Sequence, residues 1–172
     1  SQLNWREKNV QLTQSTIFPD EEKTQITVHS NKKFTLKIRY PQWASTVDGM
    51  GGLQVRINKK LVKFNAQPGE YISLNRSWRK GDKVEVTLPM KTQLEKMPDQ
   101  SNYFALLHGP IVLAAKTNPF EGETLNYLAD DSRMGHIAQA QVCPLEASPL
   151  FVSDSKNFMA SIKPVPGKSL TF

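Results

Sequence analysis

Phe34-Thr35-Leu36-Lys37-Ile38-Arg39-Tyr40 alternates apolar and polar side chains without a break. Successive side chains of a β-strand point to opposite faces, so this stretch predicts a strand with one apolar face and one solvated face. The same alternation recurs at residues 53–57 and 83–88. Several such strands predict an all-β protein, namely an antiparallel β-sandwich of jelly-roll type whose apolar faces pack together.

Turn residues separate further expected strands along the first two thirds of the chain. Pro68-Gly69 is one such turn, and Asn58-Lys59-Lys60 predicts a hairpin turn. The additional strands are expected at residues 10–13, 25–29, 61–64, 71–75, 103–107 and 111–115. The last of these is the longest apolar run, Ile111-Val112-Leu113-Ala114-Ala115, and it predicts a strand that is buried on both faces.

The pattern changes after Lys116. Prolines interrupt this part of the chain, at positions 119, 144, 149, 164 and 166. We therefore predict two regions: a β-sandwich domain at residues 1–117, and a Pro-rich irregular extension at residues 118–172 that packs on the sandwich. Within the extension we expect only a helical turn, near residues 125–129.

Composition narrows the class of protein. The 172 residues suit one domain with an appendage, and 38% of them are hydrophobic, which is enough for a core. No apolar run approaches the roughly 20 residues that span a bilayer, so we expect no membrane-embedded segment. Cys143 is the only cysteine, which excludes an internal disulfide and a multi-cysteine metal site, and we predict no cofactor.

The net charge of +6 raises the question of an acidic partner. Lys37, Arg39, Arg56 and Lys83 fall on the polar phase of the expected strands, where a one-sided sheet carries solubilising charge. No basic block or nucleic-acid-binding motif accompanies the charge, so we do not expect nucleic-acid binding.

The densest polar cluster contains Asp130, Asp131, Arg133 and His136. Carboxylates and an imidazole suit a metal ion or a substrate, so these four residues are a candidate polar site. The alternative is a loop whose polar side chains bind its own backbone. We favour this alternative, because contiguous residues rarely reach the geometry of a catalytic triad.

Trp43 and Trp78 are candidate carbohydrate contacts. Sugar rings stack on flat aromatic faces, and an exposed tryptophan on a sandwich offers such a face. The alternative is that both indoles fill the ends of the core, because Trp43 follows Pro41 at a strand end and Trp78 precedes a turn.

The remaining titratable residues indicate no reaction. A glycosidase normally places two carboxylates about 5–9 Å apart across the sugar. Asp82 and Glu95 lie at turn or polar strand positions, as do Glu21 and Glu22, so we expect all four to be solvated. His29 and His108 have no partner at metal-ligand spacing, and we expect them to be exposed or hydrogen-bonded.

Six segments in a fixed order carry a resemblance to a known family: LKIRYPQWA at 36–44, VRIN at 55–58, PGEY at 68–71, RSWRKGD at 76–82, VTLPM at 86–90 and HGPIVL at 108–113. In this order they resemble the β-sandwich region that lies after the catalytic barrel in bacterial β-L-arabinofuranosidase-type glycoside hydrolases. The resemblance covers residues 1–117, and residues 131–136 are similar to the next segment of the chain in some members.

The resemblance implies a non-catalytic accessory domain of a glycoside hydrolase. The family's active site lies in an upstream (α/α) barrel, where a cysteine nucleophile is held near a zinc ion. One cysteine cannot supply that set, so no catalytic or metal residue is transferred to this chain, and we expect this fragment not to be an enzyme. The resemblance implies the barrel domain as its partner. It also implies a periplasmic or secreted parent protein.

Two points stay open at the level of sequence. The alternative function is a carbohydrate-binding module that uses Trp43 or Trp78 to bind a plant-type oligosaccharide. The second point is the hairpin turn, where the family often has Asn-Gly and this chain has Asn58-Lys59. A type I′ turn needs positive φ at both central residues, which lysine tolerates poorly, so the turn type is undetermined.

Overall fold

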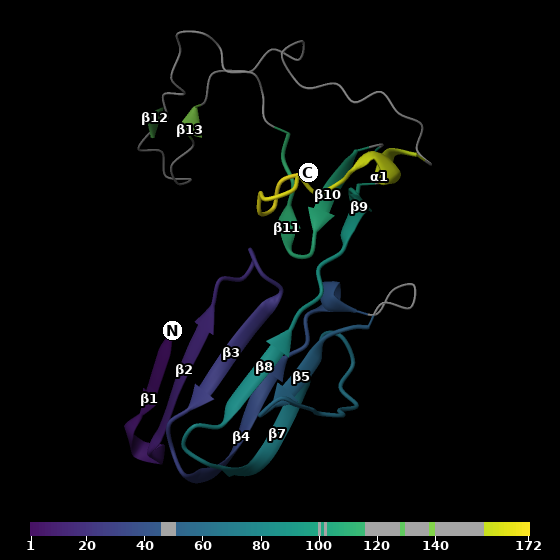
Figure 1. The fold of residues 1–172 in the computed structure, drawn as a ribbon. Coiled ribbons are helices and arrows are strands. Elements are labelled where there is room, and N and C mark those ends of the chain that lie inside the picture. Colours follow the sequence, from purple (N-terminus) through teal and green to yellow (C-terminus); the bar gives the residue numbers. More distant parts are fainter. Residues whose placement is uncertain (46–50, 100, 102, 116–127, 130–137, 140–156) are drawn as a thin grey trace. The chain divides into compact units, whose positions relative to one another are not determined.

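A computed structural model describes residues 1–45, 51–99, 101, 103–115, 128–129, 138–139 and 157–172. The described chain is built mostly from antiparallel strands with few helical residues (Figure 1), which confirms the all-β class. The jelly-roll connectivity stays a prediction. Among the described residues no helix is long and apolar enough to cross a membrane.

The largest sheet has six strands in the order β1-β2-β3-β8-β5-β6. Their bounds are Gln2–Trp5 (β1), Val10–Thr16 (β2), Lys23–Val28 (β3), Lys83–Thr87 (β8), Gln54–Ile57 (β5) and Lys60–Leu61 (β6). β8 is a central strand, because it pairs with β3 on one side and with β5 on the other. The inner face of this sheet carries apolar side chains, including Val28, Val55 and Val84, which are fully buried.

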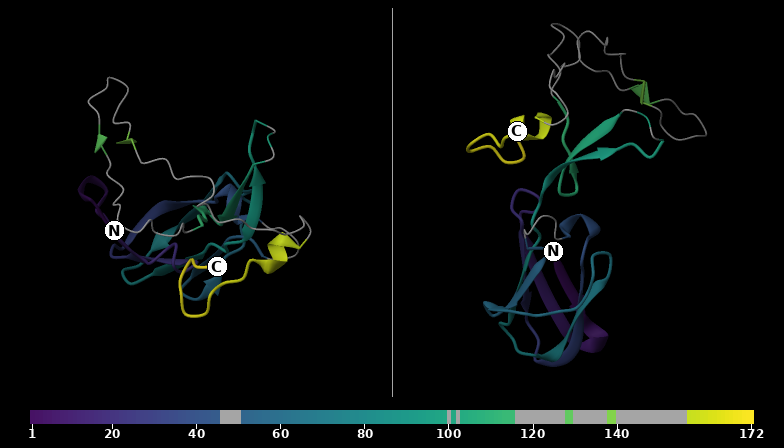
Figure 2. Two further views of the ribbon diagram at one scale, coloured as in Figure 1. Left: turned by 90° about the horizontal axis from the view of Figure 1, so that it is seen from above. Right: turned by 90° about the vertical axis from the view of Figure 1, so that its right-hand side faces the viewer.

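A second sheet contains only two strands, β4 (Lys32–Arg39) and β7 (Tyr71–Trp78). The register pairs Ile38 with Ile72 and Leu36 with Leu74, so these four apolar side chains share one face. They join the same hydrophobic cluster as the inner face of the six-stranded sheet. The predicted apolar phase of β4 is thus confirmed, and one core serves both sheets (Figure 2).

A third sheet follows in the order β11-β10-β9, with bounds Thr92–Lys96 (β9), Phe104–His108 (β10) and Ile111–Val112 (β11). Farther along, β12 (Leu128–Ala129) pairs with β13 (Ala138–Gln139), and a four-residue helix α1 spans Phe158–Ser161. Two 3-10 turns complete the elements, at Arg6–Lys8 and Gln42–Ala44.

Three expectations about elements are wrong. Residues 111–115 form only the two-residue strand β11, and Val112 is 63% exposed, because this short sheet is not covered on both faces by described residues. Leu128 and Ala129 belong to a strand pair instead of a helical turn. The strand expected at residues 61–64 is confined to Lys60–Leu61.

The hairpin between β5 and β6 has the tight geometry that the sequence left undetermined. Asn58 has φ of 50° and Lys59 has φ of 70°, so both central residues lie in the left-handed region, as a type I′ turn requires. Lys59 therefore occupies a conformation that favours glycine.

The described chain divides into two compact units, one comprising Ser1–Val112 with Ile162–Phe172 and the other Leu113–Ser161. Most of the second unit lies outside the described residues. The predicted boundary at residue 117 and the packing of residues 118–172 on the sandwich stay predictions.

Candidate functional site

Trp78 lies in the core. Its side chain is 2% exposed, its indole N–H donates to the Phe34 carbonyl at 3.0 Å, and its ring stacks on Phe34 with centroids 5.5 Å apart. The Arg76 guanidinium lies 5.1 Å from the centroid of the indole ring. With its edge bonded and its faces in contact with protein, this indole offers no surface to a sugar ring, and it fills the core as the alternative interpretation expected.

Trp43 is half-buried and stacks on Phe18, with centroids 6.0 Å apart and ring planes inclined by 22°. It lines a hollow of about 100 Å³ together with Met90 and Gln93. Small-molecule sites usually occupy about 300–1,000 Å³, so this hollow is too small to enclose a sugar unit. A carbohydrate contact by Trp43 stays a prediction.

The polar cluster Asp130, Asp131, Arg133 and His136 lies outside the described residues. Within the described part of the chain, no three His, Cys, Asp or Glu side chains come together as a metal site would require.

Asp82 is the one charged residue that is buried among the described residues, with 7% exposure, and so the expectation that it is solvated is wrong. Its Oδ1 accepts from the Asn58 side-chain amide at 2.8 Å, and its Oδ2 accepts from the Arg79 backbone N–H at 2.9 Å. Arg76 Nη2 lies 3.9 Å from the same Oδ2. Asn58 also accepts from the Lys83 backbone N–H at 2.9 Å, so the carboxylate and this amide tie two hairpins together.

The electrostatics of Asp82 follow from these contacts. The Arg79 N–H and then the Asn58 amide hold the pKa of Asp82 below its ordinary value of 3.8, and Arg76 and Arg79 add a charge effect in the same direction. A carboxylate kept ionised in this way is a hydrogen-bond acceptor for the fold and a poor proton donor. The signal in the sequence was an Asp directly after a turn glycine, Gly81, whose φ is 94°.

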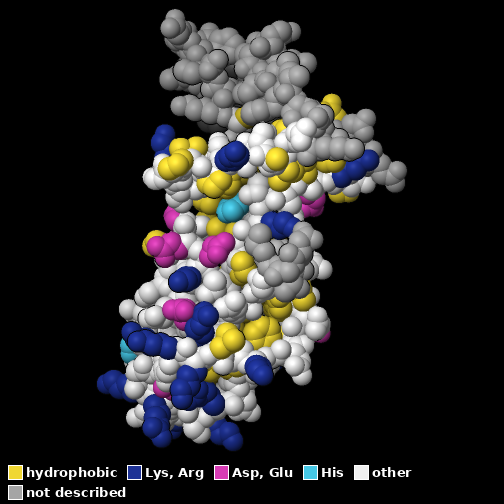
Figure 3. All heavy atoms as spheres, turned by 45° about the vertical axis from the view of Figure 1, so that its right-hand side comes forward, with side chains coloured by type: hydrophobic (Ala, Val, Ile, Leu, Met, Phe, Trp, Pro, Cys, Tyr) yellow, Lys and Arg dark blue, Asp and Glu magenta, His cyan; other side chains and the backbone are white. Residues whose placement is uncertain are grey.

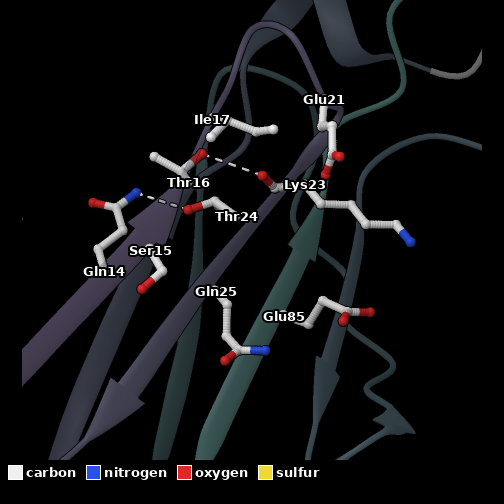
Figure 4. A pocket seen from close by; sticks show the side chains of 9 residues that line it. All are labelled: Gln14, Ser15, Thr16, Ile17, Glu21, Lys23, Thr24, Gln25 and Glu85. Carbon is white, nitrogen blue, oxygen red and sulfur yellow. Dashed lines mark hydrogen bonds between the residues drawn. The ribbon is translucent and has the colours of Figure 1, made fainter.

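A hollow of about 570 Å³ lies where β2 and β3 approach their shared hairpin (Figure 4). Most of the residues that line it have amide, hydroxyl or charged side chains: Gln14, Ser15, Thr16, Ile17, Glu21, Lys23, Thr24, Gln25 and Glu85. Gln14 Nε2 donates to Thr24 Oγ1 at 2.9 Å, and Thr16 Oγ1 donates to the Lys23 carbonyl at 3.2 Å.

The two carboxylates of this hollow do not have the surroundings of a glycosidase pair. Glu21 is exposed, and Glu85, with a 38% exposed side chain, lies 3.9 Å from Arg56. A glycosidase acid is normally held against apolar groups, which raise its pKa. The hollow is therefore suited to hydrogen bonding with a polar ligand and less to proton transfer.

Both described histidines have hydrogen-bond partners, as expected. Thr13 Oγ1 lies 2.9 Å from His29 Nε2, and Thr92 Oγ1 lies 2.9 Å from His108 Nδ1. Burial lowers the pKa of His108, whose ring also packs against Phe172 at a centroid distance of 5.0 Å. Glu22, which was expected to be solvated, instead accepts from the Met90 backbone N–H at 2.7 Å.

Comparison with protein families gives two matches that together span most of the chain. Residues 1–90 match the family described as the middle domain of GH127 β-L-arabinofuranosidases. Residues 93–172 match a family described only as a domain of unknown function. No curated protein matches the sequence.

Three solved structures have the same fold over part of their length. A glycoside hydrolase is 28% identical with a TM-score of 0.55, over 64% of this chain and 19% of its own. A GH127 β-arabinofuranosidase is 27% identical with a TM-score of 0.55, over 65% and 20%. A GH127 β-L-arabinofuranosidase from Geobacillus stearothermophilus T6 is 29% identical with a TM-score of 0.53, over 65% and 18%. The chain thus matches about a fifth of the length of these proteins.

Proposed function

This chain belongs, through residues 1–90, to the GH127 β-L-arabinofuranosidase middle-domain family, and from that premise we propose that it is a non-catalytic accessory domain of a glycoside hydrolase. Its role is to pack against the (α/α) catalytic barrel of the parent chain and to hold the orientation of that barrel. The structural relatives are about five times longer than the matched region, which leaves room for such a barrel in a parent of similar size.

The observation that carries the proposal is the unequal width of the two sheets. Six strands present an inner apolar face, while the sheet that shares their core has two. The register pairs Leu3 with Leu12 and Trp5 with Val10, so the apolar side chains of β1 lie on this inner face. Leu3 is nevertheless 50% exposed and Trp5 47% exposed, which leaves part of the inner face uncovered by described residues.

The three-stranded sheet and the residues next to its β9–β10 connection add a second group of exposed apolar side chains: Leu94, Met97, Tyr103, Phe104 and Val112. Exposed apolar groups of this kind mark surfaces that contact another protein part. Contacts between domains of one chain commonly cover about 600–1,500 Å². The β1 edge and this sheet are the two surfaces on which we place such contacts.

The test uses this 172-residue chain and the catalytic region of the parent protein, expressed separately. We expect a complex on size-exclusion chromatography, with an affinity measurable by calorimetry. The double variant Leu3→Glu and Trp5→Glu should weaken the affinity by about tenfold or more, because it places two charges in an apolar contact.

Leu61→Glu is the matched control. Leu61 is 61% exposed and pairs with Arg56, which places it on the outer face of the same sheet at the opposite edge. This variant should bind like the unmodified chain. An absence of any complex, or equal losses in both variants, overturns the proposed packing role.

The alternative function, a carbohydrate-binding module, depends on Trp43 alone once Trp78 is placed in the core. Trp43 keeps partial exposure beside a small hollow, so a bound oligosaccharide would quench its fluorescence. Saturable quenching by plant-wall oligosaccharides that Trp43→Ala abolishes, with the thermal melt unchanged, would favour this alternative over the packing role.

A further inference from the structure

The outer face of the two-stranded sheet has a distinctive set of side chains, which we call the cationic face. It comprises the outward residues of β4 and β7, all of them exposed: Lys33, Thr35, Lys37, Arg39, Tyr71, Ser73, Asn75 and Ser77. The register places these residues opposite one another in four pairs, which are Lys33 with Ser77, Thr35 with Asn75, Lys37 with Ser73, and Arg39 with Tyr71. They therefore form one continuous surface.

The charge of this surface is one-sided. Three of its eight side chains are cations and none is a carboxylate. Neither of the ion pairs found among the described residues, Arg56 with Glu85 and Arg76 with Asp82, includes a residue of the cationic face. The outer face of the six-stranded sheet differs, because there Glu85 lies opposite Arg56. Sheets that carry charge for solubility alone usually intersperse both signs.

The spacing of the cations suits a ligand with repeated negative charge. At about 3.3 Å per strand residue, the Cα atoms of Lys33 and Lys37 lie roughly 13 Å apart, and Arg39 continues the row by roughly 7 Å. On the face of the molecule drawn in Figure 3, Lys and Arg side chains (dark blue) gather toward the lower end, with Asp and Glu side chains (magenta) among them. A row of like charges that repel one another is stabilised when an extended polyanion lies along it.

The neutral side chains of the cationic face indicate what kind of polyanion fits. Tyr71, which is 54% exposed, lies with its ring centroid 5.7 Å from the Arg39 guanidinium and so limits the freedom of that group. A held guanidinium can form a bidentate pair with a carboxylate. Between the cations, Thr35, Ser73 and Asn75 offer hydroxyl and amide groups to the hydroxyls of a sugar.

We propose that the cationic face binds a polysaccharide that carries carboxylates, of the uronic-acid-containing class. Lys33, Lys37 and Arg39 bind the carboxylates, and the hydroxyl and amide side chains between them bind the sugar hydroxyls. We choose a polysaccharide over other polyanions because, under the proposed function, this chain is one domain of a glycoside hydrolase. This choice therefore rests on that proposed function. Binding would hold the parent enzyme on an acidic polymer while its catalytic region works.

The test is affinity electrophoresis and calorimetry of the 172-residue chain with polygalacturonate, with a neutral arabinan, and with double-stranded DNA. We expect binding to polygalacturonate that weakens as salt is added, and no binding to the arabinan. The triple variant K33E/K37E/R39E should lose roughly tenfold or more in affinity, because three surface attractions become repulsions.

The matched control is K23E/K60E/K83E, which makes the same change in net charge at three exposed lysines of the other sheet. It should keep its affinity within about threefold. If both triple variants lose affinity equally, or if the arabinan binds as well as polygalacturonate, the inference is overturned. DNA binding as tight as polygalacturonate binding also overturns it, in favour of nucleic-acid recognition.

Thermal melts check that both variants fold. If K33E/K37E/R39E does not fold, K33Q/K37Q/R39Q takes its place. This variant should also lose affinity for polygalacturonate, but by a smaller factor. The assay needs no catalytic region, so a failure here leaves the packing role intact. Conversely, failure of the chain to bind its catalytic region leaves polygalacturonate binding as a separate result.

Discussion

At the scale of single residues, Asp82 explains why two distant hairpins hold one geometry. Its carboxylate accepts hydrogen bonds from the Asn58 side chain and from the Arg79 backbone N–H, and the residue is only 7% exposed. Buried carboxylates are retained where every lone pair in contact with protein finds a donor. Among the described residues, no buried side-chain nitrogen or oxygen lacks a hydrogen-bond partner.

Asp82→Ala should lower the free energy of unfolding by about 1–3 kcal/mol, because it leaves the Arg79 N–H and the Asn58 amide without an acceptor. Urea denaturation measures this loss. Glu95→Ala is the control, since Glu95 is exposed, and it should change stability by less than about 0.5 kcal/mol. Equal effects of the two substitutions would contradict the structural role of Asp82.

The contribution of Asp82 should also depend on pH. Its pKa is lower in the folded state than its ordinary value of 3.8, so the unfolded chain binds the proton more tightly. The stabilisation is therefore present above pH 3.8 and lost as the pH falls through the folded-state pKa. The difference in unfolding free energy between the unmodified chain and Asp82→Asn should be constant near neutral pH and shrink in this acid range.

The subtraction isolates Asp82 from His108, whose lowered pKa gives a pH dependence common to both proteins. A difference that stays constant down to pH 3, or that grows in acid, would show that the Asp82 carboxylate is not stabilised in the folded state.

Lys59 occupies a backbone conformation that suits glycine better than lysine. Its φ of 70° places a side chain in a region that costs L-residues about 1–2 kcal/mol and costs glycine almost nothing. Lys59→Gly should therefore raise the unfolding free energy by about 0.5–1 kcal/mol, part of the gain being offset by the freedom of glycine in the unfolded chain. Lys60→Gly, in strand β6, should instead be destabilising, and the two melts together test the turn geometry.

At the scale of elements, strand β8 tests the assignment of faces. Val86 is 2% exposed and Lys83 is exposed on the same strand. Val86→Asp should cost several kcal/mol and unfold the domain, because it buries an unpaired carboxylate. Lys83→Asp should lower the free energy of unfolding by no more than about 1 kcal/mol, because its only expected cost is the lower strand propensity of Asp. Similar thermal melts for both variants would mean that the faces are assigned wrongly.

Sequence alternation predicted the strands that pack one face into the core, and it missed two edge strands. β4 and β8 alternate cleanly because one face packs into the core. β1 and β9 were not predicted, and each is an edge strand: β1 alternates over only four residues, and β9 has only Leu94 as an apolar residue. The residues of the cationic face were visible as a polar phase, but only the register shows that no carboxylate lies among them.

Candidate site residues were less predictable than strands for a physical reason. Tryptophan serves equally as a core filler and as a binding surface, and only the packing of Phe34 and Arg76 around Trp78 decides between the two. Asp82 was expected to be solvated because turn residues usually are. The side chain that donates a hydrogen bond to it, Asn58, lies 24 positions away in sequence, so local sequence did not show this contact.

At the scale of the whole molecule, membership of the GH127 middle-domain family and the uncovered β1 edge agree with each other. The domain folds around one core shared by two sheets and leaves Leu3 and Trp5 half-exposed, which is the kind of surface that the proposed packing role requires. The cationic face lies on the other sheet, so the proposed packing and the proposed polysaccharide binding involve different side chains and can be tested separately.

The last prediction concerns catalysis by this chain alone. The described carboxylates that are best held are committed to the fold: Asp82 to a turn, and Glu22 to the Met90 backbone. Glu21 and Glu85 share a hollow, but solvent reaches both, and Glu85 lies beside Arg56. We therefore expect the purified 172-residue chain to release no sugar from β-L-arabinofuranosides in an assay in which a full-length GH127 enzyme is active. Turnover by the pure chain that a single substitution such as Glu21→Gln or Glu85→Gln abolishes, with folding intact, would make this domain an enzyme in its own right.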